Sequence, residues 1–147
     1  MQKDNIVILY GSSYGTTKKI VRKVSDKLNI NSIFNIKNFK KEQLNQYKLL
    51  IFFCPTYGDE ELQIDMEIFF QSLETSLENK YFLICETGNY YGYDSFELGA
   101  KKILLYELEY RQCIQFYKNL SLDTLPRIDW NSLEEWIKGL KGYLNDE

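Results

Sequence analysis

The amino-acid sequence predicts an α/β fold in which a five-stranded parallel sheet lies between two layers of helices, as a three-layer α/β/α sandwich. Short apolar runs of strand length alternate with segments of helical periodicity along the chain. Most of these runs are apolar throughout rather than at every second position, which is typical of strands buried on both faces. Because the chain has 147 residues and no linker-like stretch, we expect one domain over residues 1–147.

The first strand and the first helix are expected at residues 6–10 and 17–28. Residues 6–10 form an unbroken apolar run. Apolar residues recur on one face of the helix, namely Ile20, Val21, Val24 and Leu28. Thr16 or Thr17 can cap the start of this helix, because a threonine hydroxyl accepts a hydrogen bond from a free N–H of the first turn.

A weaker second strand is expected at residues 31–36, where polar side chains indicate the edge of the sheet. Residues 49–54 form a central strand, which ends at Pro55 because proline has no N–H to donate to a neighbouring strand. A helix is then expected over 62–77, since apolar residues recur there at helical spacing. These residues are Leu62, Met66, Phe69, Phe70, Leu73 and Leu77.

The second half of the chain continues the alternation. A strand is expected at 81–85, a helix at about 95–109, a short strand at 113–117 and a last helix at about 131–144. The apolar residues of the last helix are Leu133, Trp136, Ile137, Leu140 and Leu144.

Strictly alternating strands and helices favour a parallel sheet, and for five strands the common order is 2-1-3-4-5. In that order the winding direction reverses between the first and third strands, so a ligand is expected at the carboxyl ends of those two strands. This geometry indicates that the loops at 11–17 and 55–62 bind the ligand, and the loop at 86–95 is their next neighbour.

The loop after the first strand has the composition of an anion site. It reads Gly11-Ser12-Ser13-Tyr14-Gly15-Thr16-Thr17. Its hydroxyls and free N–H groups meet where the helix dipole favours a negative charge. No Lys or Arg lies inside it, which fits a small monophosphate better than a nucleoside triphosphate. Taken alone, the loop is also compatible with an ordinary capped turn.

Tyrosines and glycines dominate the other two loops. Tyr57 offers a flat face beside the switch point, and Gly58 lets the backbone approach a ligand closely. The segment 86–94 adds further tyrosines and two glycines. Tyrosines from two loops can enclose an aromatic ring between them. The alternative is that these rings only cover the surface.

Together the three loops resemble those of flavodoxins, and the resemblance runs over nearly the whole chain. Residues 10–17 are similar to the flavodoxin phosphate loop. Residues 54–59 and the positions up to Asp65 look like the inner flavin loop, and 88–93 look like the outer one. Residues 126–129 also resemble the family. No long insertion splits the fifth strand, so the resemblance is to the short-chain type.

The resemblance implies that the chain binds one FMN non-covalently. The phosphate would lie in the first loop, Tyr57 and Tyr93 would stack on the two ring faces, and Asn89 would face the pyrimidine edge. The Gly58–Asp59 peptide would turn over at flavin N5 on reduction. Tyr57 stands where the family often has Trp, and Asn89 replaces the common Asp. The full set of expected cofactor contacts is Ser12, Ser13, Tyr14, Gly15, Thr16, Thr17, Pro55, Thr56, Tyr57, Gly58, Asp59, Thr87, Gly88, Asn89, Tyr91, Gly92, Tyr93 and Phe96.

The implied function is that of a low-potential one-electron carrier rather than an enzyme. Its expected partners are redox proteins, such as a ferredoxin/flavodoxin-NADP reductase and an acceptor reductase. Carboxylates near the proposed flavin edge would repel the negative charge gained on reduction and steer the edge toward basic partner surfaces. They are Asp59, Glu60, Glu61, Asp65, Glu67, Asp94 and Glu97. A merely solvated acidic face is the alternative.

Composition argues against several other classes. Residues 1–48 hold ten Lys and Arg against three Asp and Glu, whereas 49–147 hold eight against eighteen, so no basic nucleic-acid footprint lies in the second half. The chain has no His, which removes His-based nucleophile activation and disfavours a transition-metal site. Its three cysteines are expected to be buried and reduced. Without a signal peptide or membrane span, a cytoplasmic monomer is expected.

Three other functions occur on related folds and are alternatives to electron transfer. A flavodoxin-like activator of class Ib ribonucleotide reductase also binds FMN on this fold, and Gly88-Asn89 is similar to its outer loop, but Asp59-Glu60-Glu61 departs from its Gly-rich inner loop. A flavin-free interaction module on the same scaffold is a second alternative. A phosphoacceptor receiver domain is disfavoured, because Cys54-Pro55 stands where it needs an aspartate.

Overall fold

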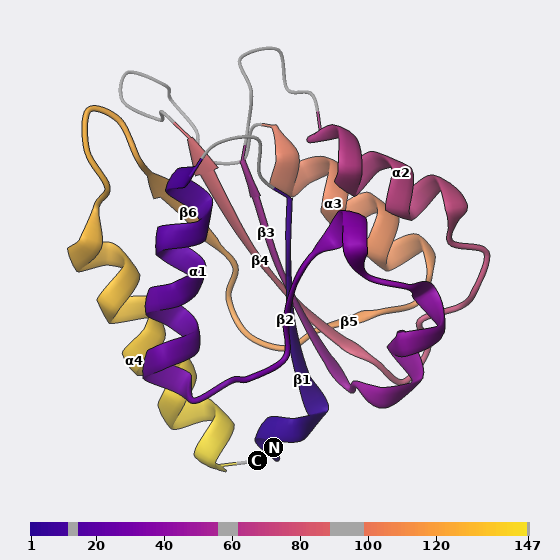
Figure 1. The fold of residues 1–147 in the computed structure, drawn as a ribbon. Coiled ribbons are helices and arrows are strands. Elements are labelled where there is room, and N and C mark those ends of the chain that lie inside the picture. Colours follow the sequence, from indigo (N-terminus) through magenta and orange to yellow (C-terminus); the bar gives the residue numbers. More distant parts are fainter. Residues whose placement is uncertain (12–14, 56–61, 89–98, 147) are drawn as a thin grey trace.

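The computed structural model describes residues 1–11, 15–55, 62–88 and 99–146, and these form one parallel sheet with helices on both sides (Figure 1). The strands run in the order β2-β1-β3-β4-β5, with β6 also paired to β4. This confirms the predicted order 2-1-3-4-5. The strands are β1 Ile6–Tyr10, β2 Ile33–Asn35, β3 Leu49–Pro55, β4 Tyr81–Gly88, β5 Ile114–Gln115 and β6 Leu120–Asp123.

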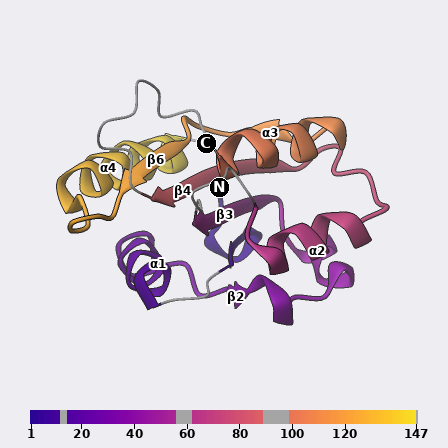
Figure 2. The ribbon, with the colours of Figure 1, turned by 90° about the horizontal axis from the view of Figure 1, so that it is seen from above.

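Two helices cover each face of the sheet, as the view from above shows (Figure 2). Helices α1, Gly15–Leu28, and α4, Trp130–Asp146, lie on one face. Helices α2, Ile64–Ser72, and α3, Ala100–Tyr110, lie on the other. Three short 3-10 helices complete the described elements, at Lys3–Asn5, Ile36–Asn38 and Lys41–Gln46. The predicted three-layer α/β/α sandwich is therefore confirmed.

The alternation of side chains along the strands divides the core in two. On β3, Leu50, Phe52 and Cys54 face α2 and α3, whereas Ile51 and Phe53 face α1 and α4. All five are fully buried. This burial on both faces explains why the strand is a continuous apolar run.

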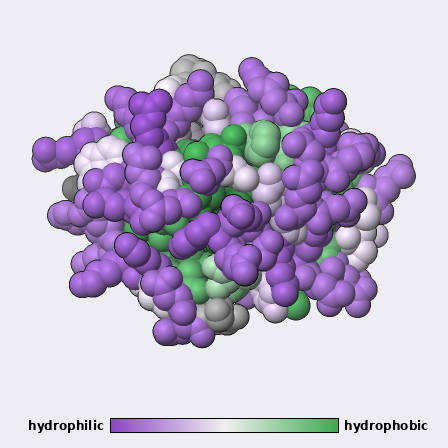
Figure 3. All heavy atoms as spheres, turned by 60° about the horizontal axis from the view of Figure 1, so that its bottom comes forward, coloured by the Kyte–Doolittle hydropathy of each residue, from purple (hydrophilic) through white to green (hydrophobic). Residues whose placement is uncertain are grey.

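The chain ends lie at the amino ends of the strands. The N-terminal ammonium of Met1 donates to the carbonyl of Leu144 in the last turn of α4, at 2.9 Å. Seen from this side, hydrophilic side chains cover most of the surface, with hydrophobic atoms showing between them (Figure 3). Among the described helices, none is long and apolar enough to cross a membrane.

The helix expected over 62–77 is shorter than predicted, because α2 ends at Ser72. Leu73 and Leu77 are buried, but they lie beyond the helix. The guanidinium of Arg111 donates to the carbonyls of Phe70 at 2.8 Å and Leu73 at 3.0 Å. Arg111 thus satisfies carbonyl groups at the helix end, a tertiary contact that the apolar spacing does not reveal.

The edge elements also differ from the predictions. Strand β2 covers only residues 33–35 of the predicted 31–36, because the Asn35 side chain accepts from Lys37 N and turns the chain into a 3-10 helix. Helix α1 starts two residues earlier than predicted. Helix α3 is described from Ala100, and 95–98 of its predicted range lie outside the described residues.

Of the predicted fifth strand over 113–117, only residues 114–115 form a strand, which is β5. A further strand, β6, follows it, and the two pair with successive parts of β4. Between them, the N–H of Ile84 donates to the side-chain oxygen of Asn119 at 2.8 Å. The N–H of Phe116 still donates to the carbonyl of Phe82 at 3.0 Å, so the Asn119 side chain takes the place of a backbone partner only at Ile84. The prediction missed β6, but it was right that no long insertion splits this edge.

Candidate functional site

The carboxyl ends of β1, β3 and β4 lie side by side at one edge of the sheet, at the top of Figure 1. In the register of the sheet, Tyr10 pairs with Phe53, and Pro55 pairs with Thr87. From this edge β1 leads to α1 on one face and β3 leads to α2 on the other. The three loops nominated from sequence therefore start from neighbouring strands at the predicted switch point.

The start of α1 has the properties of an anion site. Gly15 is its first residue, and no acidic side chain lies in its first turn. Thr16 is exposed, whereas Thr17 is only 3% exposed. A Cβ placed on Gly15 would meet no described atom within 4 Å, so this position has room for a side chain. Free N–H groups and the positive end of the helix dipole together fit a phosphate group.

Gly11, at the base of the first loop, is in close contact with the start of α2. Its N–H donates to the carbonyl of Phe53 at 3.0 Å. The place where a Cβ of Gly11 would stand is filled by the side-chain amide of Gln63. Gly11 at the start of the first loop is thus in contact with Gln63, which follows the inner loop.

Gln63 is held by two hydrogen bonds of its own and is 1% exposed. Its side-chain oxygen accepts from Met66 N at 3.0 Å and so caps α2, and its amide donates to Asp65 at 2.9 Å. Gln63 is absent from the predicted contacts. Its position before a helix is a weak signal, because Gln is not a favoured capping residue.

The last residues of β4 are also held in place, by burial and by hydrogen bonds. Thr87 is 3% exposed, and the carbonyl of Gly88 accepts from the N–H of Thr124 at 2.9 Å. The motif at 126–129 has a structural role, since the Asp129 carboxylate accepts from Ser132 N at 3.2 Å and Ser132 Oγ at 2.6 Å in the first turn of α4. The base of the outer loop is therefore tied to β6 and to the segment before α4.

The three cysteines are buried, and burial favours the protonated thiol over the reactive thiolate. Burial, with a further contribution from the Glu86 charge, raises the pKa of Cys54 to about 12 and also raises the pKa of Cys85. Burial raises the pKa of Cys113 to about 12. All three thiols are free and buried, as predicted.

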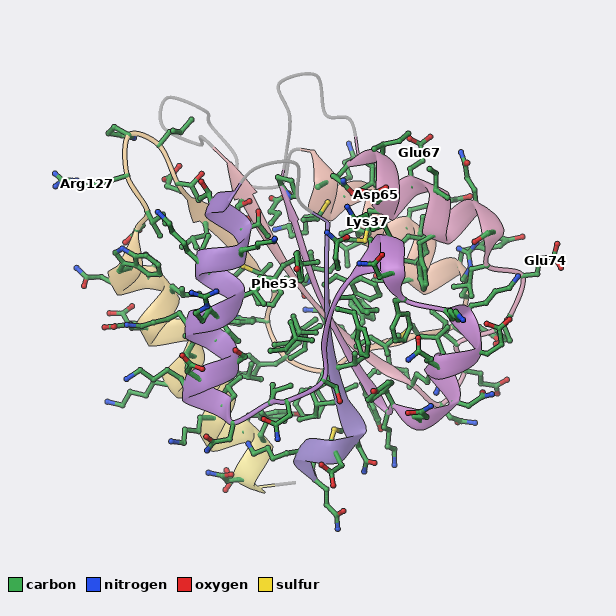
Figure 4. All side chains as sticks on the ribbon, viewed as in Figure 1. Lys37, Phe53, Asp65, Glu67, Glu74 and Arg127 are labelled. Atoms are coloured by element: carbon green, nitrogen blue, oxygen red, sulfur yellow. The ribbon has the colours of Figure 1, made fainter. Side chains whose placement is uncertain are left out.

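Six of the predicted cofactor contacts are among the residues that the structure describes, and all six lie at this edge. They are Gly15, Thr16, Thr17, Pro55, Thr87 and Gly88. The others lie outside the described residues, and they are Ser12, Ser13, Tyr14, Thr56, Tyr57, Gly58, Asp59, Asn89, Tyr91, Gly92, Tyr93 and Phe96. Of the predicted acidic rim, Asp65 and Glu67 lie in the first turn of α2, near the same edge (Figure 4). Within the described ranges no cluster of His, Cys, Asp and Glu is suited to a metal ion.

Comparisons with known proteins agree with this geometry. A family model described as flavodoxin matches residues 8–104. A flavodoxin from Helicobacter pylori is 32% identical over 71 residues, which are 48% of this chain and 43% of that protein. The chain thus matches less than half the length of that curated relative.

Solved structures show the same fold. Flavodoxin 2 from Bacillus cereus superimposes with a TM-score of 0.81 at 23% identity, covering 97% of this chain and 99% of the other. A flavodoxin from Fusobacterium nucleatum, solved with flavin mononucleotide bound, gives 0.70 at 20% identity, covering 93% and 96%. Because the family model covers more than half of the chain, the protein belongs to the flavodoxin family, whose members are generally electron-transfer proteins that bind FMN.

Proposed function

We propose that this chain binds one FMN at the carboxyl edge of its sheet and carries single electrons between redox proteins. The observation that supports this most is the convergence of three strand ends and the start of α1 at one edge, with no acidic residue in the first turn of that helix. FMN, when bound, supplies the redox chemistry, and the protein holds, orients and tunes it.

In this proposal the first loop and α1 bind the phosphate. The N–H groups of Gly15, Thr16 and Thr17 lack carbonyl partners within the helix, so they are available to phosphate oxygens. Ser12 and Ser13 add hydroxyl donors. Lys18 and Lys19 are exposed on the next positions of α1 and add attraction that salt weakens.

The flavin ring would lie between the inner and outer loops. We assign Tyr57 and Tyr93 to its two faces and Asn89 to its pyrimidine edge. The Gly58–Asp59 peptide would rearrange to donate or accept at flavin N5. The other expected contacts would line the ring or support these residues, and they are Tyr14, Pro55, Thr56, Thr87, Gly88, Tyr91, Gly92 and Phe96.

The acidic rim would set how the carrier works. Asp65 and Glu67 lie on the first turn of α2, and the other rim carboxylates precede or follow them in the loops. Negative charge near the ring disfavours reduction and lowers the potential. The same carboxylates would guide basic surfaces of a ferredoxin/flavodoxin-NADP reductase and an acceptor reductase to the flavin edge. We place the protein in the cytoplasm, where its three buried thiols stay reduced.

FMN titration followed by photoreduction tests the proposal. We expect one FMN per chain, quenching of its fluorescence, and reduction in two separate one-electron steps. Tyr93→Ala should weaken FMN binding by roughly 1–3 kcal/mol, because a stacked ring is lost. Tyr110→Ala is the matched control, since Tyr110 is 74% exposed on the outer face of α3, and it should leave the affinity unchanged.

Absence of fluorescence quenching at micromolar protein would refute FMN binding. A single two-electron step would contradict one-electron transfer and favour quinone-reductase chemistry instead. Electron transfer to a basic partner protein should slow as salt is added, and a rate that does not depend on salt would argue against docking through the acidic rim.

A further inference from the structure

Glu86 is a carboxylate inside the core, near the carboxyl end of β4. It is 0% exposed, and it follows Phe82 and Ile84 on the face that packs against α2 and α3. A carboxylate in such a place is costly unless it is well hydrogen-bonded. Its contacts therefore indicate what it does there.

The two oxygens of Glu86 bind two different elements. Oε2 accepts from the backbone N–H of Lys101 at 2.7 Å, and Oε1 accepts from Ser121 Oγ at 2.7 Å. Both distances lie within the range of well-formed hydrogen bonds. One side chain of β4 thus joins the start of α3 to β6.

The contact with α3 replaces a missing helix cap. Lys101 is the second residue of α3, so its N–H has no carbonyl partner within the helix. The residue before the helix is Gly99, which has no side chain to cap it and has a φ of 87°, in the left-handed region. Glu86 supplies the cap from a position 15 residues earlier, and its negative charge suits the positive end of the helix dipole.

The contact with β6 lies in the same row of the sheet. Cys54, Glu86 and Ser121 are partners in register on β3, β4 and β6. Cys54 and Glu86 share the face toward α3, and the charge of Glu86 contributes to the raised pKa of the Cys54 thiol. The carboxylate therefore lies at a junction of three strands and one helix.

We propose that Glu86 is the positioning residue of the outer flavin loop, because its hydrogen bond to Lys101 joins β4 to α3, the two elements between which that loop runs. Glu86 lies two residues before Gly88, and its partner Lys101 lies two residues after Gly99. Fixing both ends would set where Asn89 and Tyr93 stand relative to the ring. This inference rests on the proposed FMN binding.

Variants of Glu86 separate its hydrogen bonds from its charge and its size. Glu86→Gln keeps the shape of the side chain but removes its charge. The glutamine oxygen can accept from Lys101 N, and its amide can donate to the Ser121 hydroxyl if that hydroxyl rotates to accept. Glu86→Met keeps the volume without any acceptor, and Ser121→Ala removes one donor. Lys80→Ala is the matched control, because Lys80 precedes the opposite end of β4 and donates to the carbonyls of Leu44 at 2.8 Å and Tyr47 at 2.7 Å.

Two measurements are made on each variant. Amide hydrogen exchange at Lys101 is followed in the FMN-free protein, and the FMN dissociation constant and the visible circular dichroism of bound FMN are then recorded. For Glu86→Met we expect Lys101 to exchange about tenfold faster and FMN to bind about tenfold more weakly, with an altered dichroism spectrum. Ser121→Ala should give about a threefold weakening, and Glu86→Gln and Lys80→Ala should stay within about twofold of wild type.

The proposal is overturned if folded Glu86→Met and Ser121→Ala both bind FMN as wild type does. It is also overturned if Lys80→Ala weakens FMN binding as much as Glu86→Met, since general destabilisation would then explain the loss. Wild-type protein that leaves FMN free would contradict the proposed function instead. Exchange at Lys101, measured without FMN, would still decide whether Glu86 holds the start of α3.

Discussion

Gly11 is the residue at which β1 passes into the phosphate loop, and the backbone there has no room for a side chain. The amide of Gln63 occupies the place of a Cβ, and it cannot move aside easily, because it is buried and caps α2 through Met66 N. The sequence identifies Gly11 as part of a turn, but not the neighbour that requires it. That neighbour is 52 positions away in the chain, so no local pattern reports it.

Gly11→Ala should therefore destabilise the FMN-free protein by about 1–3 kcal/mol, since the inserted methyl overlaps Gln63 and breaks the cap of α2. Urea unfolding followed by circular dichroism measures the change. Gly15→Ala is the matched control, because its Cβ enters open space, and it should cost no stability. Equal unfolding midpoints for Gly11→Ala and wild type would refute the steric argument.

At the scale of elements, the apolar pattern predicts strands and helices better than it predicts their ends. Residues 6–10 and 49–54 are strands as expected, because burial on both faces leaves an unbroken apolar run. The end of α2 and the strand β6 were missed. Arg111 and Asn119 determine them through side-chain contacts with distant backbone groups, at Phe70 and Ile84.

Helix α4 holds two glycines in different surroundings, which allows a matched comparison within one element. A Cβ on Gly142 would meet nothing within 4 Å, whereas one on Gly139 would overlap the hydroxyl of Tyr117. Gly142→Ala should raise the free energy of unfolding by about 0.5–1 kcal/mol, because alanine loses less backbone entropy in a helix.

Gly139→Ala should show no such gain, since the ring of Tyr117 must move away from its contact with Tyr143. Thermal and urea unfolding of the two variants provide the comparison. Equal stabilisation by both substitutions would show that Tyr117 does not constrain this face of the helix.

At the scale of the molecule, the candidate site was predictable because it depends on topology. Alternating strands and helices imply the parallel order, and the order places the ends of β1, β3 and β4 together. What the sequence does not show is how these ends are held. Gln63 supports Gly11, and Glu86 supports Lys101, through buried contacts between residues distant in sequence.

The three buried thiols make the whole molecule sensitive to alkali. An unfolded cysteine titrates near pH 8.5, whereas burial raises the pKa of Cys54 and Cys113 to about 12 and also raises the pKa of Cys85. Below about pH 8.5 the thiols are protonated in both states. Above it the unfolded chain releases protons that the folded chain retains, so stability falls as pH rises toward about 12.

Each thiol should lower the free energy of unfolding by about 1.4 kcal/mol per pH unit between about pH 9 and 12. Comparing Cys54→Ala with wild type isolates one thiol, because the other titrating groups are common to both proteins. At pH 7.5 the variant should be less stable, since a buried sulfur is lost. From pH 9 to 10.5 its stability should decline less steeply, by about 1.4 kcal/mol per pH unit. Urea unfolding across this range gives the two slopes, and parallel slopes would mean that Cys54 titrates alike in the folded and unfolded chains.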